Sequence, residues 1–245
     1  MKRNNVLKKI GIVIPAYNEE KNVERLILKI NKYLKNPLIF LIDDSVSNET
    51  SNIVKKKKLK IKYFHRKIKS GRGSAVIFGL KKIIKNKKIS AFIEMDADFS
   101  HNPKELKKNL KIFFEEKNDL LISSRYLKGS KILNWPKSRK FLSKFSNVLA
   151  KFLLRVPISD YTNGYRIYSR RAANLIIKKC GNIGDGFIVL SEILMIINLK
   201  KYKISETETI FINRIRGESS VNLKLIFQSI VGLFKIYLIK TFKKI

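Results

Sequence analysis

Residues Ser90–Pro103 read SAFIEMDADFSHNP, and this stretch decides the fold. It begins as an apolar run of β-prone residues, passes through Asp96 and Asp98, and ends on a proline suited to the first turn of a helix over 103–116. An apolar strand followed at once by a helix is typical of an α/β sheet. In such sheets ligands bind beyond the carboxyl ends of the strands, which is where both carboxylates are expected to lie.

The remainder of the first half alternates in the same way between short strand patterns and longer helical ones. We predict strands over 10–15, 38–42, 61–65, 90–95 and 120–124, and helices over 19–34, 51–57, 74–84 and 103–116. This alternation predicts an α/β fold with a mostly parallel central sheet flanked by helices. Asn18-Glu19, Asp43-Asp44 and the Asp96/Asp98 pair each follow a predicted strand, so we expect them to converge at one edge of the sheet.

The second half has a different pattern, with longer helices and few strands. We predict helices over 137–155, 170–179, 187–199 and 223–240, a loop and short strand over 159–168, and one or two strands over 203–212. No Ser- or Pro-rich linker and no internal repeat divides the chain. We therefore expect one catalytic domain over 1–222, followed by a basic amphipathic helix within 223–245.

Two amphipathic segments mix apolar and basic side chains. In 140–155 and 223–244, phenylalanine, leucine and isoleucine recur at helical spacing beside lysines. Such helices suit anionic membrane surfaces, but the same stripe is typical of a helix that packs on a core. The best candidate for a membrane span, 225–239, is shorter than the roughly 20 apolar residues required and contains Gln228 and Lys235. The N-terminal apolar stretch is broken by Pro15 and does not resemble a signal peptide.

The composition narrows the class of protein and of partner. The formal net charge is +34, from 53 Lys and Arg against 19 Asp and Glu, which favours anionic partners. Lys, Ile and Asn dominate throughout, as in chains from AT-rich genomes, and no nucleic-acid-binding motif is present. A non-catalytic nucleic-acid-binding protein is the rival hypothesis, and it predicts salt-sensitive binding. The single cysteine, Cys180, excludes an intramolecular disulfide, and two histidines without metal spacing do not indicate zinc.

The carboxylates of Asp96 and Asp98 are spaced for one kind of chemistry. At the end of a strand, residues i and i+2 point the same way, so the two carboxylates repel each other. A divalent cation such as Mg²⁺ or Mn²⁺ relieves that repulsion and keeps room for phosphate oxygens. It also neutralises a diphosphate as it leaves. Alternatively, an Asp-x-Asp sequence forms a turn or caps a helix.

Several motifs, taken in order, resemble one enzyme family. They are Ile14-Pro-Ala-Tyr-Asn-Glu-Glu20, Ile42-Asp-Asp-Ser45, Gly71-Arg-Gly-Ser-Ala75, Met95-Asp-Ala-Asp-Phe-Ser-His-Asn-Pro103, Ser123-Ser-Arg-Tyr126, Arg139-Lys-Phe-Leu-Ser143 and Asp160-Tyr-Thr-Asn-Gly-Tyr-Arg-Ile-Tyr168. Together they resemble the inverting, GT-A-fold glycosyltransferases of family 2, especially the dolichol-phosphate mannose synthases and related polyprenyl-phosphate sugar transferases. The resemblance extends from about Ile10 to Asn222. It implies the nucleotide-diphospho-sugar transferase fold.

The resemblance also implies roles at the donor side of the site. The residues expected to bind the donor nucleotide are Pro15, Tyr17, Glu19, Asp43, Asp44 and Arg214. Asp96 and Asp98 would hold the metal and the diphosphate, with Ser100 as a further metal ligand. Two positions depart from the family pattern: Ser45 stands where a glycine is usual, and Ser220 where a lysine is common.

At the acceptor side, the resemblance implies that Arg125, Arg139 and Ser143 bind a phosphate. Arg139 and Ser143 are four residues apart, so both face one side of a predicted helix. A polyprenyl phosphate is already anionic and needs no general base, whereas a hydroxyl acceptor does. For a hydroxyl acceptor, Asp160 is the candidate base.

The expected function is therefore transfer of a sugar, mannose or glucose, from GDP-mannose or UDP-glucose to a polyprenyl phosphate. We expect the enzyme to act peripherally on the cytoplasmic face of a membrane, with no nucleic acid as partner. The alternative is a family 2 transferase that acts on a sugar hydroxyl in cell-surface polysaccharide synthesis. A nucleotidylyltransferase would require a glycine-rich phosphate loop near the first strand, and residues 14–19 contain none.

Overall fold

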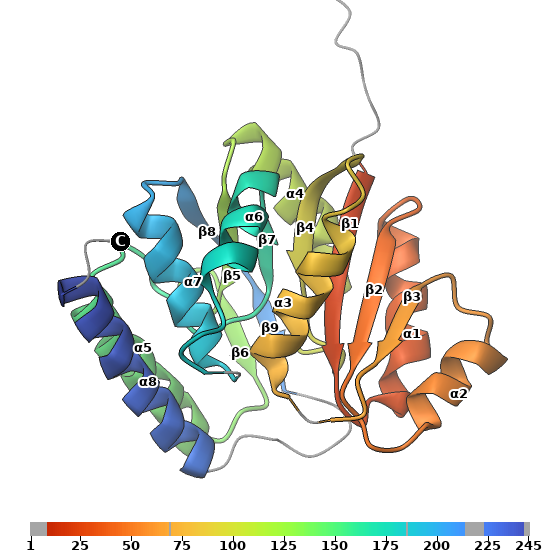
Figure 1. The fold of residues 1–245 in the computed structure, drawn as a ribbon, viewed down its shortest axis with the longest axis horizontal. Helices are drawn as coiled ribbons and strands as arrows, with labels where there is room; N and C mark the ends of the chain where they lie inside the picture. The colour runs from red at the N-terminus through yellow and green to blue at the C-terminus, as the bar shows by residue number, and fades with distance from the viewer. Residues whose placement is uncertain (1–8, 69, 185, 214–222, 243–245) are drawn as a thin grey trace, which may run out of the picture.

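A seven-stranded sheet runs through the middle of the molecule (Figure 1). The computed structural model describes residues 9–68, 70–184, 186–213 and 223–242. The strands lie in the order β3-β2-β1-β4-β7-β5-β8. Their bounds are β1 Lys9–Ala16, β2 Leu38–Asp43, β3 Lys62–His65, β4 Ile89–Glu94, β5 Leu120–Ser124, β7 Arg166–Tyr168 and β8 Ile204–Glu208.

The sheet is mostly parallel, as predicted. β1 pairs in parallel with β2 and β4, β2 with β3, and β5 with β8. The exception is β7, which lies antiparallel between β4 and β5. A second sheet, which the sequence did not predict, pairs β6 (Lys131–Leu133) with β9 (Ile210–Ile212). A three-residue strand contains too little alternation to be recognised without its partner.

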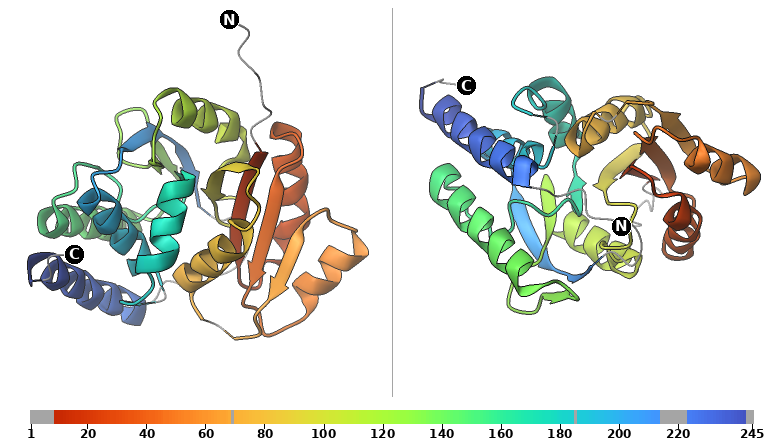
Figure 2. Two further views of the ribbon diagram at one scale, coloured as in Figure 1. Left: turned by 45° about the horizontal axis from the view of Figure 1, so that its top comes forward. Right: turned by 90° about the horizontal axis from the view of Figure 1, so that it is seen from below.

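Helices cover both faces of the large sheet (Figures 1 and 2). α1 and α4 pack on one face, while α3, α6 and α7 pack on the other. Alternate residues of β1 divide between these layers, so that Ile12 and Ile14 face α1 and α4 whereas Val13 faces α3. The helices are α1 Glu20–Tyr33, α2 Glu49–Lys56, α3 Arg72–Ile83, α4 Leu106–Glu115 after the 3₁₀ turn η1 Pro103–Glu105, α5 Lys137–Leu154, α6 Arg170–Lys179, α7 Ile188–Leu199 and α8 Leu223–Phe242.

One glycine allows α3 to lie close to the sheet. A Cβ atom at Gly79 would stand 2.4 Å from Cγ1 of Val13 on β1. Because real Cβ atoms do not approach another carbon so closely, any larger residue at this position would push the helix outward. The close contact fixes α3 over β1 and so determines where its first residue, Arg72, lies relative to the end of β4.

α5 and α8 pack side by side and, together with α7, form the far end of the molecule (Figures 1 and 2). α8 turns Leu233 and Ile236 inward, and Gly232 lies against Ile188 of α7. Its opposite side leaves Phe234 and Leu238 exposed. No helix in the part of the chain that the structure describes is long and apolar enough to cross a membrane.

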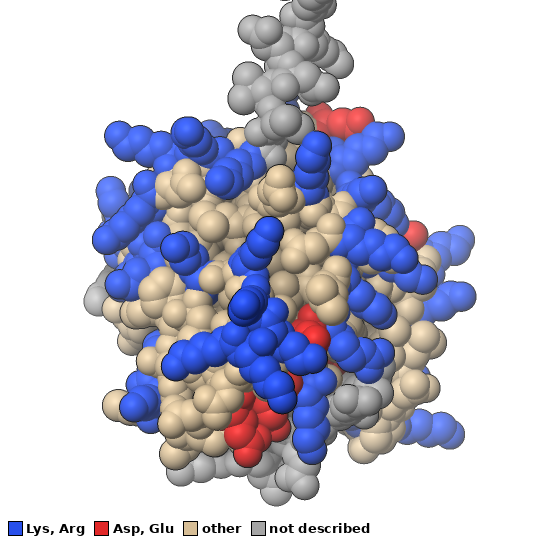
Figure 3. All heavy atoms as spheres, turned by 90° about the vertical axis from the view of Figure 1, so that its right-hand side faces the viewer, with Lys and Arg blue, Asp and Glu red and all other residues tan. Residues whose placement is uncertain are grey.

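Basic side chains are spread widely over the surface near β3, α1 and α2. Figure 3 shows Lys and Arg side chains across most of this face, with apolar and neutral surface between them and few acidic groups. A nucleic-acid-binding surface would instead concentrate them in a stripe or patch. The distribution on this face fits a high basic content along the whole chain, which has a net charge of +34.

Candidate active site

The loops after β1 and β2 form one hydrogen-bonded unit. Ser45 donates its hydroxyl hydrogen to Asp43, and the backbone N–H of Asn18 donates to the Ser45 hydroxyl at 2.7 Å. Asn18 has a positive φ of 57°, a conformation that asparagine tolerates better than most residues. Ser45 therefore links the two strand ends through its side chain.

Asp43 and Asp44, the two carboxylates predicted to bind the donor nucleotide, have different partners. Asp43 is buried and also accepts a hydrogen bond of 2.7 Å from the Tyr63 hydroxyl. Asp44 forms a bidentate ion pair with Arg66, whose Nε and Nη2 lie 2.5 and 2.6 Å from its carboxylate oxygens. Both carboxylates are thus held rigidly at the end of β2. The sequence reasoning missed Arg66, because nothing distinguishes it from the many other basic residues.

Asp96 lies two residues beyond β4 and is bound on two sides. Its carboxylate oxygen Oδ1 accepts hydrogen bonds from Nε of Arg72 at 2.8 Å, and Nη2 of the same arginine lies 2.7 Å away. Its backbone N–H donates to Nδ1 of His101 at 2.9 Å. Since Nδ1 accepts, Nε2 of His101 bears the proton and donates to Oδ1 of Asn163 at 3.0 Å. His101 therefore has a structural role and positions the backbone of Asp96.

Asp98 and Ser100 lie beside Asp96 in the same loop. Oδ1 of the buried Asp98 accepts a hydrogen bond of 3.0 Å from the backbone N–H of Ser100. The Ser100 hydroxyl is buried and has no hydrogen-bond partner in the described part of the chain. Buried hydroxyls almost always have a partner. An oxygen next to a carboxylate pair fits a divalent cation or one of its water ligands.

Arg125 is fixed by Asp160 in the interior of the protein. Nε and Nη2 of Arg125 lie 2.8 and 2.7 Å from the two carboxylate oxygens, and Nη2 also donates to Thr162 at 2.6 Å. Burial would raise the pKa of Asp160, but the charge of Arg125 and its hydrogen bonds lower that pKa below its ordinary value. A carboxylate that is 0% exposed and ion-paired cannot take a proton from a substrate. The hypothesis that Asp160 is a general base is therefore wrong, and its role is to position Arg125.

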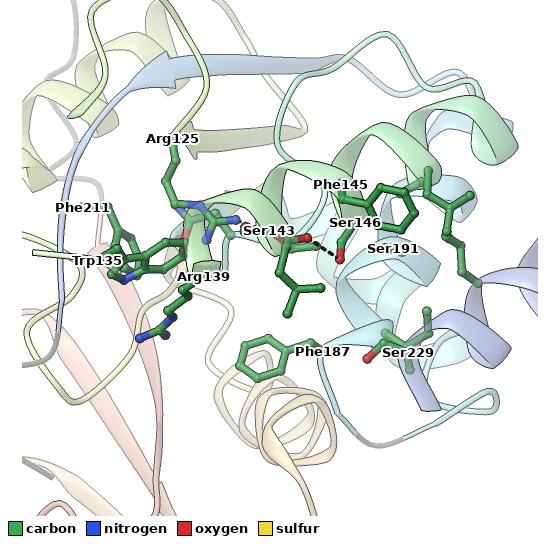
Figure 4. A pocket seen from close by; sticks show the side chains of 18 of the residues that line it. Arg125, Trp135, Arg139, Ser143, Phe145, Ser146, Phe187, Ser191, Phe211 and Ser229 are labelled. Carbon is green, nitrogen blue, oxygen red and sulfur yellow. Dashed lines mark hydrogen bonds between the residues drawn. The ribbon is translucent and has the colours of Figure 1, made fainter. Parts of the chain in front are cut away.

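Arg139 and Ser143 lie on the same side of α5, as their spacing predicts. The guanidinium of Arg139 stacks 4.3 Å above the ring of Trp135 and donates a 2.9 Å hydrogen bond to Asn213. Ser143 accepts a hydrogen bond of 2.7 Å from the Tyr126 hydroxyl. Figure 4 shows Arg125, Trp135, Arg139 and Ser143 around one end of a cavity.

That cavity, of about 230 Å³, joins the predicted donor and acceptor groups and then continues into an apolar channel. Asp96, Asp98 and Ser100 line it together with the two arginines. Beyond Ser143 the walls come from three helices. The residues that line this channel are Leu142, Phe145, Ser146, Leu149 and Ala150 of α5, Ile188 and Ser191 of α7, and Ser229, Ile230 and Leu233 of α8.

The structure brings together only some of the predicted site residues. Asp96, Asp98, Ser100, Arg125, Arg139 and Ser143 all line the cavity. The predicted nucleotide-binding residues Pro15, Tyr17 and Glu19 lie at the end of β1, and Asp43 and Asp44 at the end of β2; none of these five lines the cavity. Arg214 lies outside the described residues.

The chain is similar to known proteins of one family. The sequence profile described as glycosyl transferase family 2 matches residues 11–176. The chain is 31% identical over 234 residues to a dolichol-phosphate mannosyltransferase of Pyrococcus furiosus, covering 93% of this chain and 63% of that protein. It is 34% identical over 169 residues to a polyprenol monophosphomannose synthase of Mycolicibacterium smegmatis, covering 67% of this chain and 63% of that protein. The matches thus span less than two thirds of the length of these relatives.

A solved structure shares the fold. Glucosyl-3-phosphoglycerate synthase from Mycobacterium tuberculosis, crystallised with Mn²⁺, uridine diphosphate and glucosyl-3-phosphoglycerate, superposes with a TM-score of 0.67. The superposition covers 96% of this chain and 80% of that chain at 15% sequence identity. At this identity the similarity shows a common GT-A architecture and not a common substrate.

Proposed function

The chain belongs to glycosyl transferase family 2, and from that membership we propose that it transfers a sugar from a nucleotide-diphosphate sugar to a polyprenyl phosphate. Two relatives with 31% and 34% identity are named for polyprenol and dolichol phosphate mannose transfer, which supports this acceptor and mannose as the sugar. The names of these relatives favour GDP-mannose as the donor, and UDP-glucose is the second candidate.

The single observation that supports the proposal most strongly is the order of groups along the cavity. Two arginines stand at one end of the cavity, which Asp96 and Asp98 also line, and side chains of α5, α7 and α8 line its other end (Figure 4). A polyprenyl phosphate has the matching order, because its anionic head is followed directly by a hydrocarbon chain. Arginine is the side chain best suited to bind a phosphate through two parallel hydrogen bonds.

The reaction is a single in-line displacement. A phosphate oxygen of the acceptor forms a bond to the anomeric carbon, while the bond from that carbon to the diphosphate breaks and its electron pair leaves with the nucleoside diphosphate. The nucleophile is already anionic, so no base is required, and Asp160 is not available as one. Arg125 and Arg139 hold the acceptor against the repulsion between two phosphorylated molecules.

Asp96 and Asp98, with Ser100, would hold a divalent cation, Mg²⁺ or Mn²⁺. The Ser100 hydroxyl is buried beside the carboxylate pair and has no hydrogen-bond partner among the described residues, which supports this assignment. When bound, the cation supplies positive charge to the departing diphosphate. Pro15, Tyr17, Glu19, Asp43 and Asp44 would hold the nucleotide at the ends of β1 and β2, and Arg214 is assigned to the diphosphate by resemblance.

We also propose peripheral attachment to the cytoplasmic face of a membrane. α5 and α8 together expose large apolar side chains, namely Phe141, Val148 and Phe152 of α5 and Phe234, Leu238 and Phe242 of α8. Lysines flank them, which suits an anionic lipid surface. The 1–222 catalytic domain would then lie beside an interfacial helix within 223–245. Cys180, a free thiol, fits a reducing compartment.

The proposal is tested by incubating the protein with labelled GDP-mannose or UDP-glucose, with and without Mn²⁺. Each donor is offered a polyprenyl phosphate and, in parallel, the matching polyprenol without phosphate and a soluble glycan. We expect label to enter the organic phase only with the phosphorylated lipid. Transfer to the soluble glycan instead would favour the hydroxyl-acceptor alternative and contradict the proposal.

A further inference from the structure

Arg72 binds two carboxylates at once at the donor end of the cavity. It is the first residue of α3 and follows Gly71, whose φ is 86°. Nη1 of Arg72 lies 2.6 Å from Oε1 of Glu94, and Nη2 lies 2.7 Å from Oδ1 of Asp96. The guanidinium thus joins the last residue of β4 to the first carboxylate of the proposed metal site.

The surroundings of Arg72 are shaped to hold a guanidinium in this position. Glu94 is fully buried, and its second oxygen accepts a hydrogen bond of 2.6 Å from the Tyr168 hydroxyl. The ring of Phe187 lies 5.7 Å from the centre of the guanidinium. A Cβ atom at Gly164 would stand only 1.8 Å from Nη2, so a glycine is required there. A buried glutamate needs a cationic partner, and Arg72 provides it.

This arrangement has a consequence for any cation that approaches Asp96. A divalent cation would share its carboxylate with a guanidinium less than 3 Å away, and two cations on one carboxylate repel each other. In the described residues, no three His, Cys, Asp or Glu side chains come together as a metal site. The residues that the structure describes therefore offer a divalent cation few ligands, and one of those ligands is already neutralised.

We propose that Arg72 is a built-in counterion of Asp96 that weakens the binding of a free divalent cation. The proposal rests on the proposed function, in which Asp96 binds the metal. Its consequence is that the cation binds tightly only together with a nucleoside diphosphate. The diphosphate oxygens supply the missing ligands and the negative charge that Arg72 offsets. Arg72 is a positioning residue, because it acts on the cation through Asp96.

The experiment is a titration with Mn²⁺, followed by the electron paramagnetic resonance signal of the free ion, with and without GDP or UDP. Arg72→Met alone would leave Glu94 buried and unpaired, so the informative variant is Arg72→Met/Glu94→Gln, which keeps the local net charge constant. In the Glu94→Gln variant, Arg72 loses its ion pair with Glu94 and keeps only the ion pair with Asp96. Arg171→Met is the matched control, because Arg171 pairs with Asp119 and lines no part of the cavity.

Without nucleotide, we expect the double variant to bind Mn²⁺ at least about tenfold more tightly than the wild type, as loss of one charged contact allows. Glu94→Gln should bind more weakly than the wild type, and Arg171→Met should match it. GDP or UDP should tighten binding more in the wild type than in the double variant. A folded double variant whose affinity for Mn²⁺ is unchanged or lower would overturn the proposal.

The result is separable from the proposed function, because the titration contains neither sugar nor acceptor. A protein that shows the Mn²⁺ differences but transfers no sugar to any polyprenyl phosphate would contradict the proposed function alone. A wild type that transfers sugar but binds free Mn²⁺ as tightly as the double variant would contradict the role of Arg72 alone. Absence of Mn²⁺ binding in every variant, even with nucleotide, would contradict both the counterion role and the metal assignment.

Discussion

Replacing Asp160 by asparagine tests the claim that this carboxylate positions Arg125. The carboxylate accepts five hydrogen bonds, three from Arg125 and one each from the backbone N–H groups of Thr162 and Asn163. Asparagine offers one acceptor oxygen and turns an NH₂ group toward these donors. Removing one partner of a buried ion pair costs about 3–5 kcal/mol. We expect a loss near 4 kcal/mol, or roughly 8–16 °C in Tm for a chain of this size.

The assay is unfolding in urea, monitored by circular dichroism and repeated over a range of pH. Because the pKa of Asp160 is lowered in the folded state, its stabilisation is complete above its unfolded pKa and is lost as the pH falls through the folded value. The gap between the wild type and Asp160→Asn should therefore be constant above about pH 5 and narrow below about pH 4. Asp119→Asn is the control, and it should lose less, because its partner Arg171 stays largely exposed.

A second variant separates an unpaired charge from general damage. Asp160→Asn/Arg125→Met removes both charges, so it should unfold at a higher urea concentration than Asp160→Asn alone. If the two substitutions were simply additive, or if Asp160→Asn lay within about 1 kcal/mol of the wild type, the ion pair would not be the source of the stability. Either result would refute the positioning role.

Three further predictions concern activity and lipid binding. Asp98→Asn should lower transfer at least about 100-fold in the labelled-donor assay, and a rate near that of the wild type would exclude Asp98 from the donor site. Ala150→Phe should fill the channel and raise the KM for a long polyprenyl phosphate about tenfold, while the KM for a two-isoprene analogue stays unchanged. Equal effects on both KM values would mean that the tail does not enter the channel. Phe141→Ser/Phe152→Ser, at positions that are 74% and 72% exposed, should reduce flotation with anionic liposomes at least about tenfold, and unchanged flotation would place the membrane contact elsewhere.

The parts of the fold that the sequence predicts are those set by local pattern. The strands of the first half and the long helices have enough apolar periodicity to be recognised within about three residues of their observed ends. β7 could be expected as a short strand after residue 159, but its place between β4 and β5 could not. That place depends on pairing with strands more than 40 residues away, and no local signal encodes it. β7 brings Asn163 and Gly164 beside Asp96, so the missed topology also hid part of the site.

The site residues also divide into those that the sequence could indicate and those that only the folded structure reveals. Asp96 and Asp98 could be chosen from the sequence because they end an apolar strand, whereas Arg139 and Ser143 were named by the family resemblance, and helical spacing only predicted that they share one side of a helix. Their partners could not be chosen in advance, since a chain with 53 Lys and Arg residues gives no reason to choose Arg72 or Arg66 over the others. Asp160 was misassigned because a lone carboxylate in a loop looks the same in sequence whether solvent or an arginine surrounds it.

The pairing of Asp160 with Arg125 bears directly on the choice of acceptor. A transferase that acts on a sugar hydroxyl needs a carboxylate or imidazole able to take a proton at the cavity. Among the described cavity-lining residues, the only such groups are Asp96 and Asp98, which are assigned to the donor. An acceptor that is already deprotonated instead needs positively charged side chains around it, and Arg125 and Arg139 provide them in this cavity. The positive charge that these two arginines provide therefore supports the proposed lipid phosphate acceptor.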